Sequence, residues 1–137
     1  MDWKTRKTRF LPGSEDLAMS AWSPDGRHIA ATDGVQLRVF DIRNERWIFL
    51  ASGKAITPPY WSRSGKYVYY QDEFEPEQPI WRVSIDGRKV ERMMSSRQIP
   101  QSDLSGYELV GLAPDDAPIA SIVRTNSDIY ALELELP

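Results

Sequence analysis

Carboxylate side chains are densest between residues 72 and 77, where they could bind a metal ion. Four of them fall within six residues, namely Asp72, Glu73, Glu75 and Glu77, with Phe74 and Pro76 between them. Carboxylate oxygens are ligands that Ca²⁺ prefers, but this segment lacks the Asp-x-Asp-x-Asp-Gly frame of a calcium-binding loop. The pattern is therefore typical of a solvated acidic loop, and we predict no metal site and no cofactor.

Histidine and serine could supply acid–base or nucleophilic catalysis, but the sequence arranges neither for it. His28 is the only histidine, and the Gly-x-Ser-x-Gly turn that holds the nucleophile of many hydrolases is absent. A Ser-His-Asp triad would have to use His28, which follows a predicted turn. The sequence therefore predicts no catalytic residue, and we expect that the protein is not an enzyme.

Charge and hydropathy exclude further classes of partner. Lys4, Arg6, Lys7 and Arg9 form a basic run, but the protein carries a formal net charge of −3, so we expect no nucleic-acid partner. No stretch approaches the roughly 18 apolar residues of a membrane-spanning helix, and no secretory signal follows the basic start. Cysteine is absent, which excludes disulfides and thiolate metal sites.

Two short sequence patterns recur in the same order and indicate which elements carry these residues. The first occupies residues 21–30 and returns at 60–69 and, more weakly, at 111–120. The second follows each copy, at 37–42, 80–85 and 129–134. Copies of the first pattern lie about 40 and then about 50 residues apart, a period typical of a repeat made of four short strands.

A tight turn followed by a strand accounts for the first pattern. Pro24 presets φ, Asp25 can accept hydrogen bonds from neighbouring amides, and Gly26 allows a positive φ. The second copy keeps the glycine and lacks the Pro-Asp pair. We expect the motif residues to build the turn and the packing of each repeat: Trp22, Ser23, Pro24, Asp25, Gly26, Trp61, Ser62 and Gly65.

Each repeat is predicted to be a four-stranded antiparallel meander, the blade of a β-propeller. The predicted chain is all-β, with blades at residues 17–51 and 57–95 and a third at 106–136 that lacks its outer strand. A β-sandwich of about ten strands is the rival interpretation, but it does not explain why the patterns recur in order. The five tryptophans fall mostly on predicted strands, where we expect packing between blades and not sugar stacking.

The same residues carry a family resemblance. Trp22-Ser23-Pro24-Asp25-Gly26 followed by Ile29-Ala30 resembles the WD-repeat-like blade of the six-bladed TolB-type propellers, and Trp61-Ser62 with Gly65 is similar. The resemblance extends over nearly the whole chain through three copies. Propellers of this type occur in periplasmic envelope proteins, in bacterial sensors or regulators, and as gating domains of prolyl-oligopeptidase-like enzymes. The resemblance implies the fold and does not choose among these roles.

The two ends of the chain are predicted to be strands of complementary kind. Residues 1–11 fit an outer strand, and residues 129–136 fit a third strand with no fourth strand after it. The first segment is basic and the last is acidic, so opposite charges favour pairing of one chain end with the blade of the other. Solvated edge strands are the alternative. Because three blades are too few for a ring, we expect either a second copy or further blades of a longer propeller.

The sequence thus predicts a non-enzymatic propeller module that presents loops to a protein or ligand, with a protein or a second copy of itself as partner. The loop between the second and third strands of a blade should lie at the same end as the connection between blades. The acidic loop is therefore the candidate contact surface: Asp72, Glu73, Phe74, Glu75 and Glu77.

The alternative is part of a hydrolase or sensor whose activity lies on another domain. We expect no membrane insertion. The location would be periplasmic or extracytoplasmic for a piece of a TolB-like protein and cytoplasmic otherwise.

Overall fold

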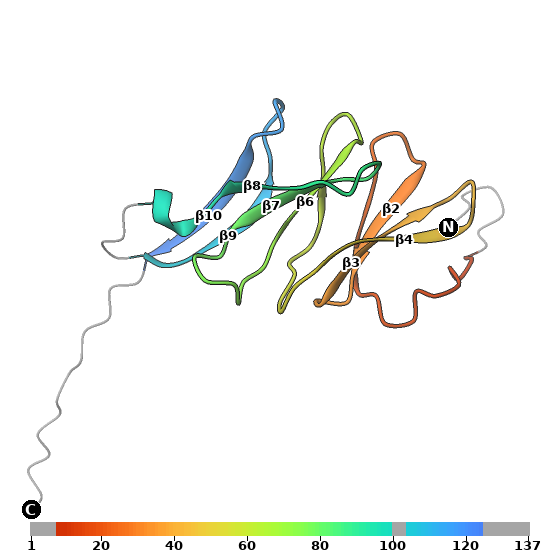
Figure 1. The fold of residues 1–137 in the computed structure, drawn as a ribbon, viewed down its shortest axis with the longest axis horizontal. Coiled ribbons are helices and arrows are strands. Elements are labelled where there is room, and N and C mark those ends of the chain that lie inside the picture. Colours follow the sequence, from red (N-terminus) through yellow and green to blue (C-terminus); the bar gives the residue numbers. More distant parts are fainter. Residues whose placement is uncertain (1–7, 100–103, 125–137) are drawn as a thin grey trace, which may run out of the picture.

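Ten strands form three antiparallel sheets in the part of the chain that the structure describes (Figure 1). The structure is a computed structural model and describes residues 8–99 and 104–124. The first sheet contains, in order, β1 (Met19–Trp22), β2 (His28–Thr32), β3 (Gln36–Asp41) and β4 (Arg46–Ser52). The second contains β5 (Tyr60–Trp61), β6 (Tyr67–Gln71), β7 (Ile80–Ser84) and β8 (Val90–Met94). The third pairs β9 (Leu104–Leu112) with β10 (Pro118–Arg124).

The first two sheets are meanders in which strands adjacent in sequence pair with each other. This confirms the predicted all-β class and the four-stranded antiparallel units. The helical structure described is η1 (Ser96–Gln98), a short 3-10 turn, and no helix in residues 8–99 and 104–124 could cross a bilayer. β9 begins at Leu104, ahead of residue 106, where the third blade was predicted to begin. Ser105 therefore lies in a strand. The strand predicted at residues 129–136 lies outside the described residues.

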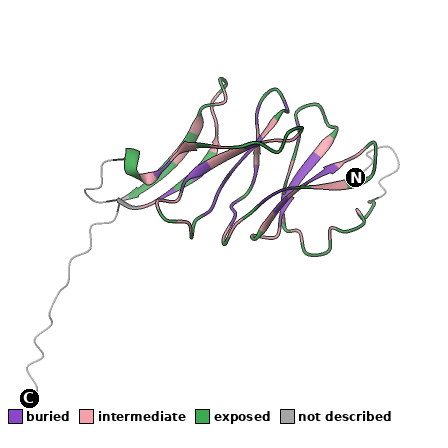
Figure 2. Cartoon of the chain, viewed as in Figure 1, coloured by how far each residue is buried: buried purple, intermediate pink, exposed green. Residues whose placement is uncertain are grey.

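Along each strand the side chains alternate between the two faces of the sheet. In the register of β2 and β3, Ala30 lies opposite Val39, and Ile29 lies opposite Phe40 on the other face. Ala30 and Val39 belong to a buried cluster with Val68 of the second sheet. A second cluster contains Tyr69, whose neighbours in the third sheet are Tyr107 and Leu109. The buried residues therefore lie mainly on the inner strands, where one sheet packs against the next (Figure 2).

The turn between β1 and β2 explains the first recurring pattern. The hydroxyl of Ser23 donates to Asp25 Oδ1 (2.6 Å) and accepts from the backbone amide of His28 (2.9 Å). The amide of Gly26 donates to the carbonyl of Ser23 (2.9 Å), and Gly26 has a φ of 68°. These bonds close a tight turn that needs a residue free to adopt positive φ.

The other two copies of the turn keep this geometry with fewer of the motif residues. Ser62 accepts from the amide of Tyr67 (3.0 Å), and Gly65 has a φ of 69°. In the third copy Asp116 stands where the others have glycine, and it adopts the same left-handed conformation with a φ of 66°. Aspartate tolerates this region better than most residues do, which is why the third turn survives the loss of its glycine.

The segment before β1 differs from the outer strand predicted for residues 1–11. Residues 8–11 contain no strand, and residues 1–7 lie outside the described part of the chain. Arg9 forms an ion pair with Glu45 (2.6 Å), and the indole of Trp47 donates to the carbonyl of Pro12 (2.8 Å). The segment therefore lies against its own first sheet, because the indole binds the carbonyl next to the Pro12-Gly13 bend.

Candidate functional site

The acidic loop, residues 72–79 between β6 and β7, lies at the end of the sheets where the chain passes from the first sheet to the second. Ile56 of this connection forms a bridge with Asp72, and its amide donates to the carbonyl of Gly34 in the β2–β3 turn (2.6 Å). The amide of Glu73 donates to the carbonyl of Ala55 (3.0 Å). The loop is thus at the same end as the connection between sheets, as the meander predicted.

Asp72 is a structural residue and not a contact residue. Its side chain is only 5% exposed. One carboxylate oxygen accepts from the amide of Lys54 (2.8 Å), and the other accepts from the amides of Ala55 (3.0 Å) and Phe74 (3.1 Å). The prediction that Asp72 touches a partner is therefore wrong, because its oxygens bind the connection between the sheets instead.

Two further carboxylates of the loop are bound by their own sheet. Glu75 Oε2 accepts from the indole of Trp81 (3.0 Å), and Glu77 forms ion pairs with Arg92 and with Arg97 (2.5 Å for the latter). Burial raises the pKa of the nearby Tyr70 to about 12, and the negative charges of Glu75 and Asp72 contribute to this shift. Glu75 and Glu77 are half-buried, so they are less available to a partner than the sequence suggests.

Glu73 and Phe74 are the predicted contact residues that stand free of the sheet. Glu73 is exposed, and the phenyl ring of Phe74 is 70% exposed. Three hydrogen bonds to Asp72 hold the backbone at the base of the loop. Phe74 is therefore an exposed apolar group at the tip of an acidic loop whose backbone is held in place. No group of three or more His, Asp or Glu side chains suited to hold a metal ion occurs within residues 8–99 and 104–124.

The motif tryptophans divide between packing and exposure. The indole of Trp61 donates to the carbonyl of Ala21 across the junction of the first two sheets (2.9 Å). Trp22, its counterpart one repeat earlier, is 61% exposed. Trp61 therefore packs between sheets, whereas no sheet lies against Trp22 within residues 8–99 and 104–124, so packing between blades stays a prediction for Trp22. Trp3 lies outside the described residues.

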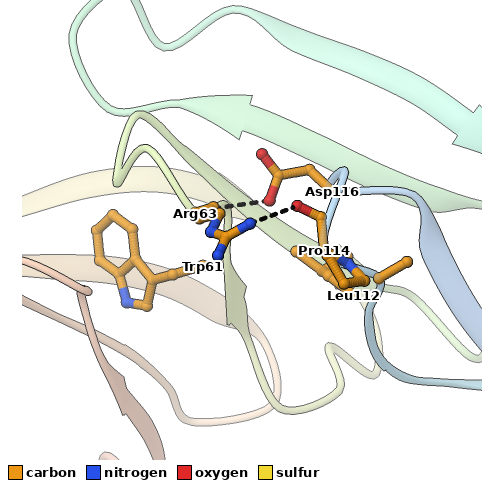
Figure 3. A pocket seen from close by; sticks show the side chains of 6 residues that line it. Trp61, Arg63, Leu112, Pro114 and Asp116 are labelled. Carbon is orange, nitrogen blue, oxygen red and sulfur yellow. Dashed lines mark hydrogen bonds between the residues drawn. The ribbon is translucent and has the colours of Figure 1, made fainter.

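A hollow of about 290 Å³ at the opposite end of the sheets joins two copies of the recurring turn (Figure 3). The amide of Arg63 donates to Asp116 Oδ1 (2.7 Å), and the Arg63 guanidinium donates to the carbonyl of Pro114 (3.3 Å). Trp61, Leu112 and Ala113 complete the lining. This contact could not be predicted from the sequence, because Asp116 only replaces the glycine of the other two turns. Both charged residues are already used in joining the second and third sheets.

A wider hollow of about 500 Å³ is lined by Asp41, Asn44, Arg46 and Ile48. Asp41 accepts from the amides of Arg43 (2.8 Å) and Asn44 (3.2 Å) and from the Asn44 side chain (2.6 Å). The amide of Asn44 is the main cause that holds the pKa of Asp41 below its ordinary value. This carboxylate therefore stabilises the β3–β4 hairpin.

His28 is placed for packing. Its ring lies 6.1 Å from that of Trp61, centroid to centroid, between the first two sheets. Its Nδ1 is buried and has no hydrogen-bond partner among the described residues. The hydroxyls of Ser23 and Ser62 are both hydrogen-bonded within their own turns, so neither is paired with the His28 ring.

Comparison with known proteins supports the fold more than the function. No family model matches the chain. An uncharacterized protein of Agrobacterium fabrum is 31% identical over an alignment of 104 residues, and the match covers 69% of this chain and 35% of that protein. The chain thus spans about a third of the length of this curated relative.

Solved structures share the arrangement of the sheets. TolB from Acinetobacter baumannii superposes with a TM-score of 0.55 at 19% identity, over 79% of this chain and 31% of that one. A prolyl endopeptidase gives 0.57 at 21%, over 79% and 18%, and the tricorn protease gives 0.64 at 16%, over 84% and 12%. Together with the four-stranded meanders, these likenesses define the class: the sheets are blades of a β-propeller. At these identities they show the fold alone, so the hydrolase or sensor alternative stays a prediction.

Proposed function

We propose that the chain is a non-enzymatic, TolB-type propeller module that binds a protein through the loop end of its second sheet. The observation that carries the proposal is the contrast within the acidic loop. Asp72 is buried and holds the base of the loop to the connection at Lys54 and Ala55, whereas Phe74 is 70% exposed at the tip.

The chemistry of this surface indicates the kind of partner. An exposed aromatic ring beside a free carboxylate, Phe74 beside Glu73, suits a protein surface with an apolar pocket rimmed by basic side chains. A loop that is already fixed loses little conformational freedom on binding, which favours affinity. The likeness to TolB supports the proposal at the level of the fold.

Site-specific photo-crosslinking in the cells that produce the protein tests the proposal. A benzophenone amino acid replaces Phe74 in one variant and Val90 in the control, because Val90 is an exposed apolar residue of the same sheet. We expect one discrete protein adduct from position 74, which is absent from position 90 and is lost when Glu73→Lys is added. The same adducts from both positions, or none from position 74, would reject the proposal.

A further inference from the structure

The first sheet has an apolar face that no other sheet covers in the described chain. Trp22 and Ile29 are opposite each other in register, as are Phe40 and Trp47, on the side away from the second sheet. Residues 10–17 cover only part of this face, and a groove of about 210 Å³ remains between Leu17 and Trp22. We call this surface the leading face. Its most exposed apolar side chains are Trp22 (61%) and Phe49 (48%).

The third sheet, at the other end of the row of sheets, has a face that nothing covers within residues 8–99 and 104–124. Ala120 packs toward the second sheet, so its neighbours along β10 point away from that sheet. We call this surface the trailing face. Its exposed apolar side chains are Val110 (45%), Ile119 (46%) and Val123 (51%). Exposed apolar groups gathered on one face mark an interaction surface more often than scattered ones do.

The junction between the first and second sheets shows how a leading face is normally covered. Trp61 and Val68 lie on the face of the second sheet that packs against Ala30 and Val39 of the first. The indole of Trp61 donates to the carbonyl of Ala21, the residue before Trp22 in the preceding copy of the turn motif. Trp22 corresponds to Trp61, so the leading face lacks both the sheet and the carbonyl that the repeat provides.

The trailing face offers what the leading face lacks. In the third copy of the motif, Leu112 stands where the earlier copies have tryptophan, so Gly111 corresponds to Ala21. The carbonyl of Gly111 is the acceptor that a Trp22 indole would reach if the same packing were repeated. The faces also carry opposite charges, because Arg38 lies with Phe49 on the leading face and Glu108 lies opposite Ser121 on the trailing face.

We propose that the leading face of one copy of this chain packs on the trailing face of a second copy, with the Trp22 indole donating to the carbonyl of Gly111. The proposal does not depend on the loop surface around Phe74. A second copy is the occupant that the structure favours, because this one chain carries both complementary faces and its own sheet junction supplies the geometry. Two copies that join through both pairs of faces form a closed ring. A contact between two unlike faces gives a ring when the rotation that relates one copy to the next returns to the first copy.

The mass of the protein in solution is the first test. We expect light scattering to give about twice 15.7 kDa for the native chain at micromolar concentrations. Trp22→Asp and Ile119→Asp each place a charge on one face, and each should reduce the mass to 15.7 kDa with an unchanged circular dichroism spectrum. Phe74→Asp, on neither face, should remain dimeric. A native chain that stays at 15.7 kDa overturns the proposal.

Cysteine cross-linking tests the head-to-tail direction without disturbing an apolar contact. The chain has no cysteine, so Ser20→Cys on the leading face and Ser121→Cys on the trailing face are unique thiols, and both positions are exposed. After unfolding and refolding together, the two variants should form an oxidised dimer that neither forms alone. If Ser20→Cys alone gives as much dimer as the mixture, the leading faces pack on each other and the proposal is wrong.

Discussion

Asp72 binds three backbone amides that belong to two different segments of the chain. Its oxygens accept from Lys54 and Ala55 in the connection between sheets and from Phe74 in its own loop. Removal of the carboxylate leaves these amides without acceptors in a buried position.

We therefore expect Asp72→Ala to lower the free energy of unfolding by about 1–3 kcal/mol, the usual cost of unsatisfied buried polar groups. Glu73→Ala, in the same loop but exposed, should change it by less than about 0.5 kcal/mol. Urea unfolding followed by tryptophan fluorescence measures both. Equal effects of the two substitutions would contradict the structural role given to Asp72.

Asp33 makes a contribution to the free energy of unfolding that depends on pH. The amides of Gln36 (2.6 Å) and Val35 (2.8 Å) donate to its carboxylate and hold its pKa below the ordinary value of 3.8. Because the folded pKa is the lower one, this stabilisation is fully present above about pH 4 and is lost as the pH falls through the folded value.

The free energy of unfolding of Asp33→Asn should therefore fall less steeply below about pH 4 than that of the native chain. Urea titrations at a series of pH values between about 2 and 7 measure the two slopes. Parallel curves would mean that the turn hydrogen bonds do not favour the charged carboxylate.

The sequence alone predicts the role of some of these residues and not of others. The hydrogen bonds of Ser23, Asp25 and Gly26 join residues within one turn, so the turn could be predicted from residues adjacent in the sequence. The role of Asp72 could not, because its partners at Lys54 and Ala55 are remote in sequence and meet it only when the second sheet packs on the first. Asp116 was missed for the same reason, since its partner Arg63 belongs to another repeat.

At the scale of elements, Gln71 at the end of β6 joins the second sheet to the third. Its side chain is fully buried. The amide group donates to the carbonyls of Gln78 (3.0 Å) and Tyr107 (3.3 Å), and its oxygen accepts from the amide of Leu109 (2.9 Å). One neutral side chain of the second sheet thus forms hydrogen bonds with the carbonyl of Tyr107 and the amide of Leu109, although no strand of the second sheet pairs with β9.

Gln71→Ala should destabilise the contact between these sheets by about 3 kcal/mol, because two backbone groups of β9 lose their partner and a small cavity forms. We expect hydrogen exchange to speed up in β9 and β10 more than in β2 and β3. Gln36→Ala, which loses only bonds from the Arg38 side chain, is the control. A uniform increase over all three sheets would show that the junction is not a local one.

The strands themselves were predictable because they depend on local signals. The four-stranded antiparallel units predicted from the recurring patterns are the sheets β1–β4 and β5–β8. The segment at residues 8–11 was not predictable. It carries the composition of a strand, but its conformation is decided by the bend at Pro12 and by the distant Trp47.

At the scale of the whole molecule, the three sheets follow one another in a row, with the second between the other two (Figure 1). The described junctions join sheets that are adjacent in sequence, through Trp61 and Ala21 in one case and through Gln71 and Leu109 in the other. Stability in such an arrangement is close to a sum of the sheets and of their contacts with neighbours. Within the described residues of a single chain each outer sheet has one neighbour, so in the monomer the outer sheets should open before the middle one.

The indole-to-carbonyl bond from Trp61 to Ala21 also bears on how a protein of this kind changes in length. The bond joins the tryptophan of one repeat to the residue before the tryptophan of the preceding repeat, so a whole unit that carries both positions recreates the bond at a new junction. An insertion of part of a unit would place the indole opposite the wrong residue. Gain and loss in this lineage should therefore proceed by whole blades, and duplication of a gene segment supplies a finished contact surface together with each new blade.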